Sequence, residues 1–279
     1  MKVRMVQFSP LLGNLKKNIE YHLKTVEQAI KDGIELVVFP ELSLSGYQLK
    51  DIVYDSIIKN GDKIIRDFEE ISKKINIVIG TPYEENPGII YNSAIVFSSG
   101  KMHHIHRKVQ LPNFGMFEEA MIFKAGDKFM PFKIGDFNAG ILICREILFP
   151  VNAYLYYMQN VDFIIAISNS PHRGMGKDGF TSHKLWERLG EVYSINFHQN
   201  YIFVNRTGFE DGIGFGGGSF FSSAGKGITR MGKYYEDEII DVDISADAVR
   251  RARISANYLR DEKPEIILKE FNRIINGKD

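Results

Sequence analysis

The chain has 279 residues, 44% of them hydrophobic, which is enough for a sizeable core in one large domain or two small ones. Its 35 basic residues equal its 35 acidic residues, so no net charge favours nucleic acid or an anionic membrane as a partner. A single cysteine excludes an internal disulfide, and the amino-terminal residues read as a strand, not as a signal peptide. No apolar run reaches the roughly 18 residues of a membrane helix. We therefore expect a soluble, cytoplasmic protein.

The first part of the chain alternates between strand and helix patterns. Residues 3–8 predict a strand, and residues 14–30 predict a helix because their apolar side chains recur at helical spacing. Residues 35–40 are almost continuously hydrophobic, which is typical of a strand buried on both faces. The order strand, helix, strand indicates a parallel crossover unit. Glu41 directly follows the second strand, where a carboxylate serves either as a helix cap or as a catalytic base.

The next patterns predict a helix at about 57–74 and three strands, at 75–80, 89–97 and 102–109. Lys108 lies at the end of the last of these strands. His104 and His106 alternate on one face of this strand, which is compatible with a metal site. No carboxylate or thiol lies nearby at ligand spacing, so we interpret the two histidines as polar strand surface.

The only cysteine, Cys144, follows an apolar run from Gly140 to Ile143 and precedes a charged Arg145-Glu146 pair. This pattern predicts that the sulfur lies where a buried strand ends and a helix begins. The N–H groups at the start of such a helix would lower the pKa of the thiol and make it a nucleophile. The alternative is a small buried core residue, since free cysteine is among the most buried residue types.

The rest of the chain continues the alternation. Helices are expected at about 151–159, 181–198 and 246–254, and strands at 162–168, 201–205, 219–222 and 238–244. The glycine-rich stretch 214–219 is no phosphate loop, because it leads into a strand and lacks the Lys-Ser/Thr pair. The tail from Tyr258 to Asn276 carries an apolar stripe that must bury against the protein's own body or a second subunit.

Glu41, Lys108 and Cys144 each follow a core strand, so a parallel crossover arrangement would bring them to one rim of the sheet. A thiolate, a carboxylate base and an ammonium together can transfer an acyl group from nitrogen. Cys144 would attack a carbonyl carbon while Glu41 takes its proton. Lys108 and the backbone N–H of Arg145 would stabilise the oxyanion.

Three segments, Phe39–Tyr47, His106–Asn113 and Ile143–Pro150, resemble the signature segments of the nitrilase superfamily, the carbon–nitrogen hydrolases with a Glu-Lys-Cys triad. The resemblance implies an α/β fold, a four-layer αββα sandwich over residues 1–254, with residues 255–279 as a tail at a subunit interface. It also implies a homodimer or larger homo-oligomer that needs neither a metal nor another cofactor.

The resemblance also adds site residues. Members of the superfamily keep a second glutamate in a Phe-x-Glu segment, which falls on Glu119 here and would orient Lys108 or the substrate amide; the alternative is a solvated loop acid. Within the superfamily the chain resembles the glutaminase domains of glutamine-dependent NAD synthetases. This similarity assigns four residues to substrate binding, namely Arg145, Phe114, Ser168 and Ser170. The segments that carry the similarity also contain Gly176-Lys177.

Arg145 and Phe114 differ from the acidic residue and the tyrosine that these glutaminase domains usually carry. We therefore expect a hydrolase of a small linear amide that releases ammonia and a carboxylic acid. Nitrile hydrolysis, carbamoyl-amide hydrolysis and a glutaminase subunit that supplies ammonia to a separate synthetase are the alternatives. A non-enzymatic scaffold conflicts with the intact triad, and a redox thiol protein would need a second, resolving cysteine.

Overall fold

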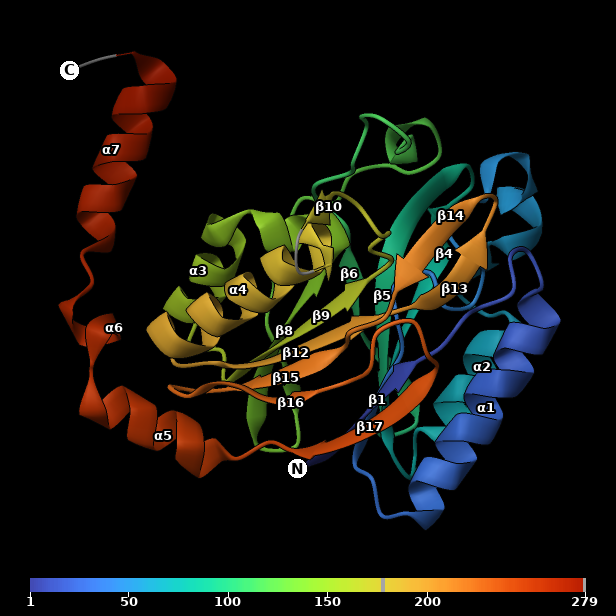
Figure 1. Ribbon diagram of the computed structural model, residues 1–279, viewed down its shortest axis with the longest axis horizontal. Coiled ribbons are helices and arrows are strands. Elements are labelled where there is room, and N and C mark those ends of the chain that lie inside the picture. Colours follow the sequence, from blue (N-terminus) through green and yellow to red (C-terminus); the bar gives the residue numbers. More distant parts are fainter. Residues whose placement is uncertain (177–178, 278–279) are drawn as a thin grey trace.

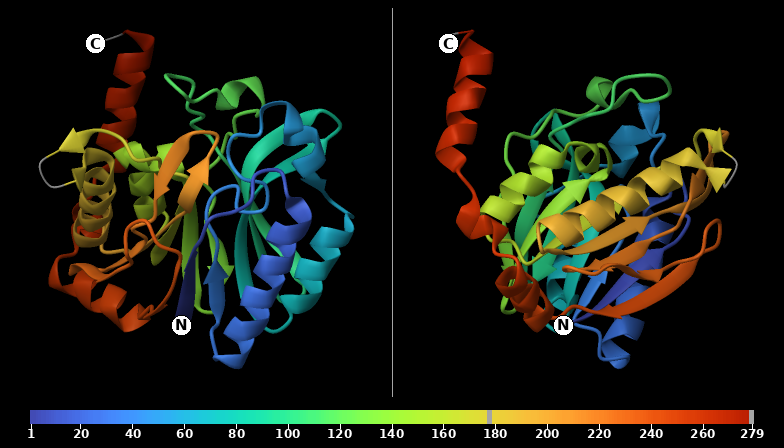
Figure 2. Two further views of the ribbon diagram at one scale, coloured as in Figure 1. Left: turned by 45° about the vertical axis from the view of Figure 1, so that its right-hand side comes forward. Right: turned by 60° about the vertical axis from the view of Figure 1, so that its left-hand side comes forward.

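Two β-sheets pack face to face, and each is covered on its outer side by two helices (Figures 1 and 2). The computed structural model describes residues 1–176 and 179–277. The αββα layers follow from the pattern of the strands, because side chains alternate between the faces of a strand and both faces here are apolar. The expected four-layer sandwich is confirmed.

The first sheet has the order β17-β1-β2-β4-β5-β6, with β3 beside β4. Its strands are β1 (Lys2–Gln7), β2 (Leu36–Val38), β3 (Ile58–Lys59), β4 (Asn76–Asn86), β5 (Ile89–Ser98), β6 (Lys101–Arg107) and β17 (Glu238–Asp243). Strands β1, β2 and β4 are parallel, and two antiparallel hairpins then bring β6 into the same direction as β2. The carboxyl ends of β2 and β6 therefore lie at the same edge.

The second sheet has the order β16-β15-β12-β9-β8-β7. Its strands are β7 (Phe132–Ile134), β8 (Phe137–Ile143), β9 (Phe163–Ser168), β12 (Asn200–Asn205), β15 (Phe220–Ser223) and β16 (Gly227–Met231). Strands β8, β9 and β12 are parallel, so their carboxyl ends also share one edge. Two short hairpins, β10 (Met175–Gly176) with β11 (Gly179–Phe180) and β13 (Thr207–Glu210) with β14 (Ile213–Gly216), lie outside both sheets. As expected, the glycine-rich stretch 214–219 leads into a strand.

The central core lies between the sheets, where Val38 of the first sheet and Ile143 and Ile165 of the second belong to one buried apolar cluster. A second cluster joins the outer face of the first sheet to α1 (Leu15–Lys31) and α2 (Lys63–Ile71). A third joins the second sheet to α3 (Pro150–Met158) and α4 (Thr181–Asn196). The central cluster thus holds the two sheets against each other, and the two outer clusters hold the helices on the sheets.

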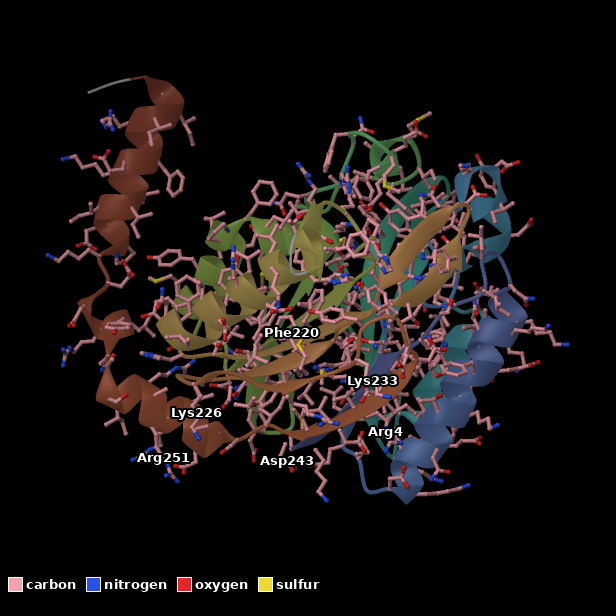
Figure 3. The ribbon with its side chains drawn as sticks, in the orientation of Figure 1. Arg4, Phe220, Lys226, Lys233, Asp243 and Arg251 are labelled. Carbon is pink, nitrogen blue, oxygen red and sulfur yellow. The ribbon has the colours of Figure 1, made fainter. Side chains whose placement is uncertain are left out.

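Helix α4 approaches its sheet closely because Gly190 has no side chain. A Cβ atom at this position would lie 2.3 Å from Phe220 of β15, which is fully buried beneath the helix (Figure 3). A glycine in the middle of a helix costs about 1 kcal/mol relative to alanine. Here that cost is offset by direct packing of the helix backbone on an aromatic ring.

The helix that the sequence predicts at 57–74 is shorter in the structure. Residues 58–59 instead pair with β4, and Gly61 follows with a left-handed φ of +86°. Only α2, which begins at Lys63, is helical, because the turn at Gly61 separates the two elements. The short 3₁₀ helices η1 (Lys50–Ser56), η2 (Glu119–Met121) and η3 (Cys144–Leu148) were not expected as separate elements.

The carboxyl-terminal segment passes one end of the second sheet, beside the turn between β15 and β16, and then leaves the body (Figures 1 and 2). It consists of α5 (Ala246–Ser255), α6 (Tyr258–Asp261) and α7 (Pro264–Asn276). No residue of α6 or α7 is buried. Tyr258 of α6 stacks on His198 at 5.1 Å between ring centres, whereas the apolar residues Phe271, Ile274 and Ile275 of α7 are exposed. In the described residues, no helix combines the length and the apolar character that crossing a bilayer requires.

Candidate active site

Lys108 and Cys144 lie immediately beyond the ends of β6 and β8, and Glu41 lies three residues beyond Val38, the last residue of β2. Glu41 and Lys108 leave the first sheet at one edge, and Cys144 leaves the second sheet at the edge that faces it. The backbone N–H of Asn169, just beyond β9, donates to Glu41 Oε2 at 2.8 Å and so connects the two sheets at this point. The rim predicted from the sequence therefore exists, but it is built from two facing sheets and not from one.

The ammonium of Lys108 lies between two carboxylates. Its Nζ is 2.6 Å from Glu41 Oε1 and 2.8 Å from Glu119 Oε1, and neither Lys108 nor Glu41 is exposed to solvent. Burial alone would lower the pKa of Lys108, but the charges of Glu119 and Glu41 outweigh burial and raise that pKa. The lysine is therefore a permanent cation at this site.

Glu119 is 5% exposed, so the interpretation of this residue as a solvated loop acid is wrong. Its carboxylate accepts hydrogen bonds from Lys108 and from the hydroxyl of Tyr47 at 2.7 Å. Burial raises the pKa of Glu119, and the neighbouring ammonium opposes this only in part. Tyr47 and Glu119 also form part of the wall of a cavity of about 590 Å³, which connects this corner of the site to the surface of η1 and η2.

Asn92 of β5 is a site residue that the sequence did not single out. Its Nδ2 donates to Glu41 Oε1 at 2.8 Å and to Glu119 Oε2 at 3.3 Å, which holds the two acids in a fixed relation. The sequence could have indicated this residue because Asn92 is polar in an otherwise apolar strand, and a buried amide needs a hydrogen-bond partner. The side chain of Asn169 is buried too, and neither of its polar atoms has a partner in the described residues.

Cys144 is the first residue of η3 and has a left-handed φ of +45°, an uncommon conformation for a residue other than glycine. Burial, followed by the negative charge of Glu41, raises the pKa of the thiol to about 12. The expected lowering of this pKa is therefore wrong. The physical reason is that η3 has only five residues, so its N–H groups offer less than the desolvation and the nearby carboxylate remove.

The interpretation of His106 as polar strand surface is wrong. His106 is 2% exposed and its Nε2 lies 2.8 Å from Glu146 Oε2, so it is an interior residue and not polar surface. His104 is partly buried and stacks on Phe132 at 4.5 Å between ring centres. Among the described residues, no group of three His, Cys, Asp or Glu side chains could hold a metal ion.

The four residues assigned to substrate binding occupy different surroundings. The guanidinium carbon of Arg145 lies 4.6 Å from the ring centre of Phe114, which is 45% exposed, and Arg145 forms no ion pair with Glu146 or Glu41. Ser168 is fully buried at the end of β9, and its hydroxyl forms no hydrogen bond within the described part of the chain, although its position beside Cys144 acts to lower the pKa of that thiol. Ser170 Oγ instead accepts from Trp186 at 2.6 Å. Lys177 lies outside the described residues.

Comparison with known proteins agrees with this geometry. A family model described as carbon–nitrogen hydrolase matches residues 2–254. The chain is 30% identical, over 250 residues, to a glutamine-dependent NAD(+) synthetase of Thermotoga maritima, covering 88% of this chain and 42% of that protein. It is 27% identical to a nitrilase of Pyrococcus abyssi, covering 91% of this chain and 94% of the relative.

The fold is similar to that of a carbon–nitrogen hydrolase from Helicobacter pylori G27. The TM-score is 0.84 at 22% identity, and the match covers 95% of this chain and 96% of that one. The chain spans less than half the length of the synthetases that it matches, whereas it matches the nitrilase over nearly its full length.

Proposed function

Because the chain belongs to the carbon–nitrogen hydrolase family, we propose that it hydrolyses a small linear amide to ammonia and a carboxylic acid. The observation that carries this proposal is the ammonium of Lys108, held 2.6 Å from Glu41 and 2.8 Å from Glu119 beside the only cysteine. A fixed cation beside a base and a nucleophile supplies what acyl transfer from nitrogen requires.

In the first half of the reaction, the Cys144 sulfur attacks the carbonyl carbon while its proton passes to Glu41. The negative oxygen of the tetrahedral intermediate is stabilised by Lys108 and by the backbone N–H of Arg145, the second residue of η3, which has no partner within a helix. Glu41 then gives the proton to the nitrogen, the carbon–nitrogen bond breaks, and ammonia leaves. The acyl group remains on sulfur as a thioester.

In the second half, Glu41 removes a proton from water, and the oxygen attacks the thioester carbon. The carbon–sulfur bond breaks, the thiol regains the proton, and the acid is released. Because the pKa of the Cys144 thiol is raised to about 12, the free thiolate is scarce near neutral pH. We therefore expect attack to be concerted with proton transfer to Glu41, which makes the carboxylate important for the first step.

Three alternatives use the same residues. A nitrile would be attacked at carbon by the same thiol, and the nitrilase of Pyrococcus abyssi supports this option. A glutaminase role, in which the ammonia is passed to a separate synthetase, is supported by the relatives named as glutamine-dependent NAD(+) synthetases. Carbamoyl-amide hydrolysis differs only in the group attached to the carbonyl.

Arg145 favours a substrate that carries a carboxylate. Its guanidinium stacks on the exposed ring of Phe114 beside the nucleophile and cannot lose its charge. We therefore place an ω-amide of a dicarboxylic acid without an α-amino group ahead of glutamine, and Ser168 completes the pocket beside the thiol. The balanced charge of the chain supports a cytoplasmic location, and the exposed tail supports a homodimer or larger assembly.

The test is ammonia release across amides, ω-amides of dicarboxylic acids, carbamoyl amino acids and nitriles, in the wild type and two variants. Cys144→Ala and Glu41→Gln should each lower turnover at least ~10³-fold while the circular dichroism spectrum is unchanged. A Cys144→Ala variant that keeps more than about a tenth of the activity would show that the thiol is not the nucleophile.

A further inference from the structure

Glu146, two residues after Cys144, is fully buried and accepts three hydrogen bonds on its two carboxylate oxygens. The backbone N–H of Ile143 donates to Oε2 at 2.6 Å, and the backbone N–H of Val109 donates to Oε1, also at 2.6 Å. Ile143 directly precedes Cys144, and Val109 directly follows Lys108. One carboxylate therefore connects the ends of two strands that belong to different sheets.

The third hydrogen bond comes from His106, whose Nε2 is 2.8 Å from Oε2 of the same carboxylate. Backbone N–H groups can only donate, so both Glu146 oxygens act as acceptors. We assign the proton of His106 to Nε2, so that the imidazole donates to Oε2 as the Ile143 N–H does. A second connection runs in parallel, because Asn152 Nδ2 donates to the backbone oxygen of Glu146 and to Gln110 Oε1.

We propose that Glu146, oriented by His106, is a positioning residue that fixes the distance between the Cys144 nucleophile and the Lys108 ammonium. This inference rests on the proposed function, but it assigns a role to two residues outside the Glu-Lys-Cys triad. The two catalytic residues leave separate sheets, so packing within either sheet does not set their separation. The apolar core between the sheets holds the sheets together, and the Glu146 carboxylate, bonded to both backbones, joins the two strand ends directly at the site. Displacing a reacting group by about 1 Å can cost 10²-fold in rate.

The substitution Glu146→Gln tests this role without a change of shape. An amide presents one oxygen and one NH₂ group, so whichever way it is turned, the NH₂ faces the N–H of Ile143 or that of Val109. One strand end is therefore released in every orientation. We expect kcat to fall about 30- to 100-fold with KM changed less than about threefold, because the substrate pocket does not include this carboxylate.

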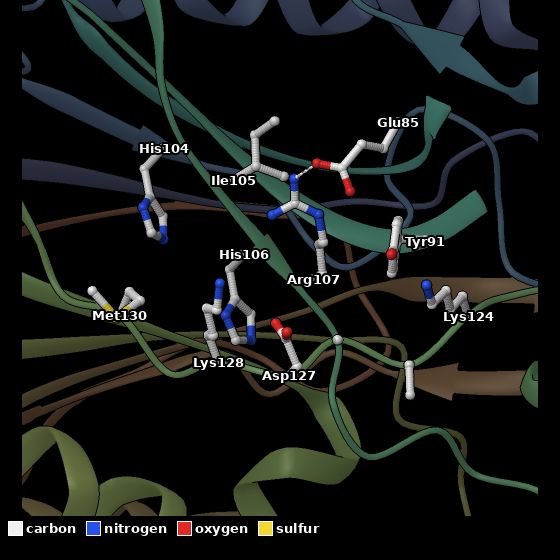
Figure 4. Close-up of a pocket in the computed structure, with 12 residues that line it drawn as sticks. Glu85, Tyr91, His104, Ile105, His106, Arg107, Lys124, Asp127, Lys128 and Met130 are labelled. Carbon is white, nitrogen blue, oxygen red and sulfur yellow. Dashed lines mark hydrogen bonds and ion pairs between the residues drawn. The ribbon is translucent and has the colours of Figure 1, made fainter. Parts of the chain in front are cut away.

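His106 offers a second test because it also lines a cavity of about 510 Å³ that opens beside β6. Figure 4 shows His104 and His106 projecting from this strand, with Arg107 paired to Glu85 on its other side. Imidazole can therefore enter from solvent and occupy the space vacated in a His106→Ala variant. His104→Ala is the matched control, since His104 lines the same cavity and has no hydrogen bond to Glu146.

The expected results are a low kcat in His106→Ala that rises at least about fivefold with added imidazole, and a His104→Ala variant that has wild-type kcat and no response. A purely structural role would lower the melting temperature without this rescue. Wild-type kcat in a folded Glu146→Gln variant would overturn the proposal while leaving the proposed function intact, because Cys144→Ala would still be inactive.

If the wild type hydrolyses none of the substrates, the proposed function fails. Hydrogen exchange at the amides of Ile143 and Val109 then tests whether Glu146 connects the two strand ends. Faster exchange in Glu146→Gln than in the wild type supports it, and equal exchange overturns it.

Discussion

At the scale of single residues, the fully buried Lys108 compensates the charges of two carboxylates, Glu41 and Glu119. In Lys108→Met the oxyanion loses a charged donor, so kcat should fall about 10²- to 10³-fold, as for an oxyanion-hole group. The melting temperature should fall as well, because Glu41 and Glu119 then repel each other in a buried site. Steady-state kinetics and thermal unfolding measure the two effects.

A double variant separates these effects of Lys108. Adding Glu119→Gln removes one of the uncompensated acids, so the melting temperature of Lys108→Met should recover in part while kcat does not. The exposed Lys124 supplies the control, and Lys124→Met should match the wild type in both measurements. A Lys108→Met variant with wild-type kcat would show that the lysine serves the fold alone.

Arg145 is the residue that should determine the charge of the substrate. Its guanidinium lies 4.6 Å from the Phe114 ring and is not neutralised by an ion pair among the described residues, so it remains available to a substrate carboxylate. In the wild type, kcat/KM for an ω-amide of a dicarboxylic acid should exceed that for an uncharged aliphatic amide about tenfold or more, the usual worth of one charge-assisted hydrogen bond.

In Arg145→Gln this preference should disappear, with the loss concentrated on the charged substrate. Phe114→Leu is the matched comparison, because it removes the stacking ring and keeps the guanidinium. If the wild type prefers the neutral amide, or if Arg145→Gln keeps the preference for the carboxylate, the charged part of the substrate is bound elsewhere.

At the scale of elements, the sequence predicted those positions of site residues that depend on the direction of the strands. Glu41, Lys108 and Cys144 each follow a strand, and parallel strands bring their carboxyl ends to one edge. It did not predict contacts between side chains of segments far apart in the chain. Asn92 in the middle of β5 bonds to Glu41, which follows β2 of the same sheet, and His106 near the end of β6 bonds to Glu146, which follows β8 of the other sheet.

The pKa of Cys144 was predicted wrongly for a related reason. The start of a helix can be read from the chain, whereas burial and the approach of Glu41 come from distant segments, and these two effects are the larger ones. The late start of α2, by contrast, has a local cause, because the turn-forming Gly61 is visible in the sequence itself.

Helix α1 should make the fold sensitive to acid through His22. This residue is fully buried, its Nδ1 lies 2.7 Å from the backbone oxygen of Asn18, and its Nε2 lies 2.9 Å from Ser43 Oγ. Burial lowers the pKa of His22 to about 3. The unfolded chain therefore binds a proton below about pH 6.5 that the folded chain does not, so stability is lost as the pH falls from about 6.5 towards 3.

His22 alone should thus remove about 2 kcal/mol of the free energy of unfolding between pH 7.5 and pH 5. Urea unfolding at the two pH values measures this, and His22→Gln should show a smaller loss than the wild type because glutamine does not titrate. Lys24→Gln, a change in the same helix, should lose as much as the wild type. Equal acid losses in His22→Gln and the wild type would exclude His22 as the cause.

At the scale of the whole molecule, the site exists only where the two sheets meet. Glu41 and Lys108 come from one sheet and Cys144 from the other, and the hydrogen bond from Asn169 to Glu41 joins them. Neither half of the sandwich could hold the three groups alone, which explains why the family model matches nearly the whole of the sandwich, residues 2–254, as one unit. The tail beyond this unit contributes nothing to the site within one chain.

That tail should instead bind a second copy of the chain. Helix α7 has an apolar stripe whose members are at least partly exposed, with Phe271 at 47% and Ile274 at 66%, and it extends away from the body (Figure 1). An exposed stripe of this kind is unfavourable in water unless a partner covers it. Truncation after Ala256 should therefore convert a dimer or larger assembly into a smaller or aggregating species, measured as particle mass by light scattering.

Two full-length variants test whether the apolar stripe of α7 causes the association of the chains. Phe271→Glu places a charge on the apolar face and should reduce the particle mass as the truncation does, because an unpaired charge at the centre of an interface is strongly unfavourable. Lys269→Gln changes the net charge by the same amount on the opposite face of α7, and it should leave the mass unchanged. If the truncated chain and Phe271→Glu both keep the subunit number of the wild type, the tail is not an interface and its apolar stripe serves another contact.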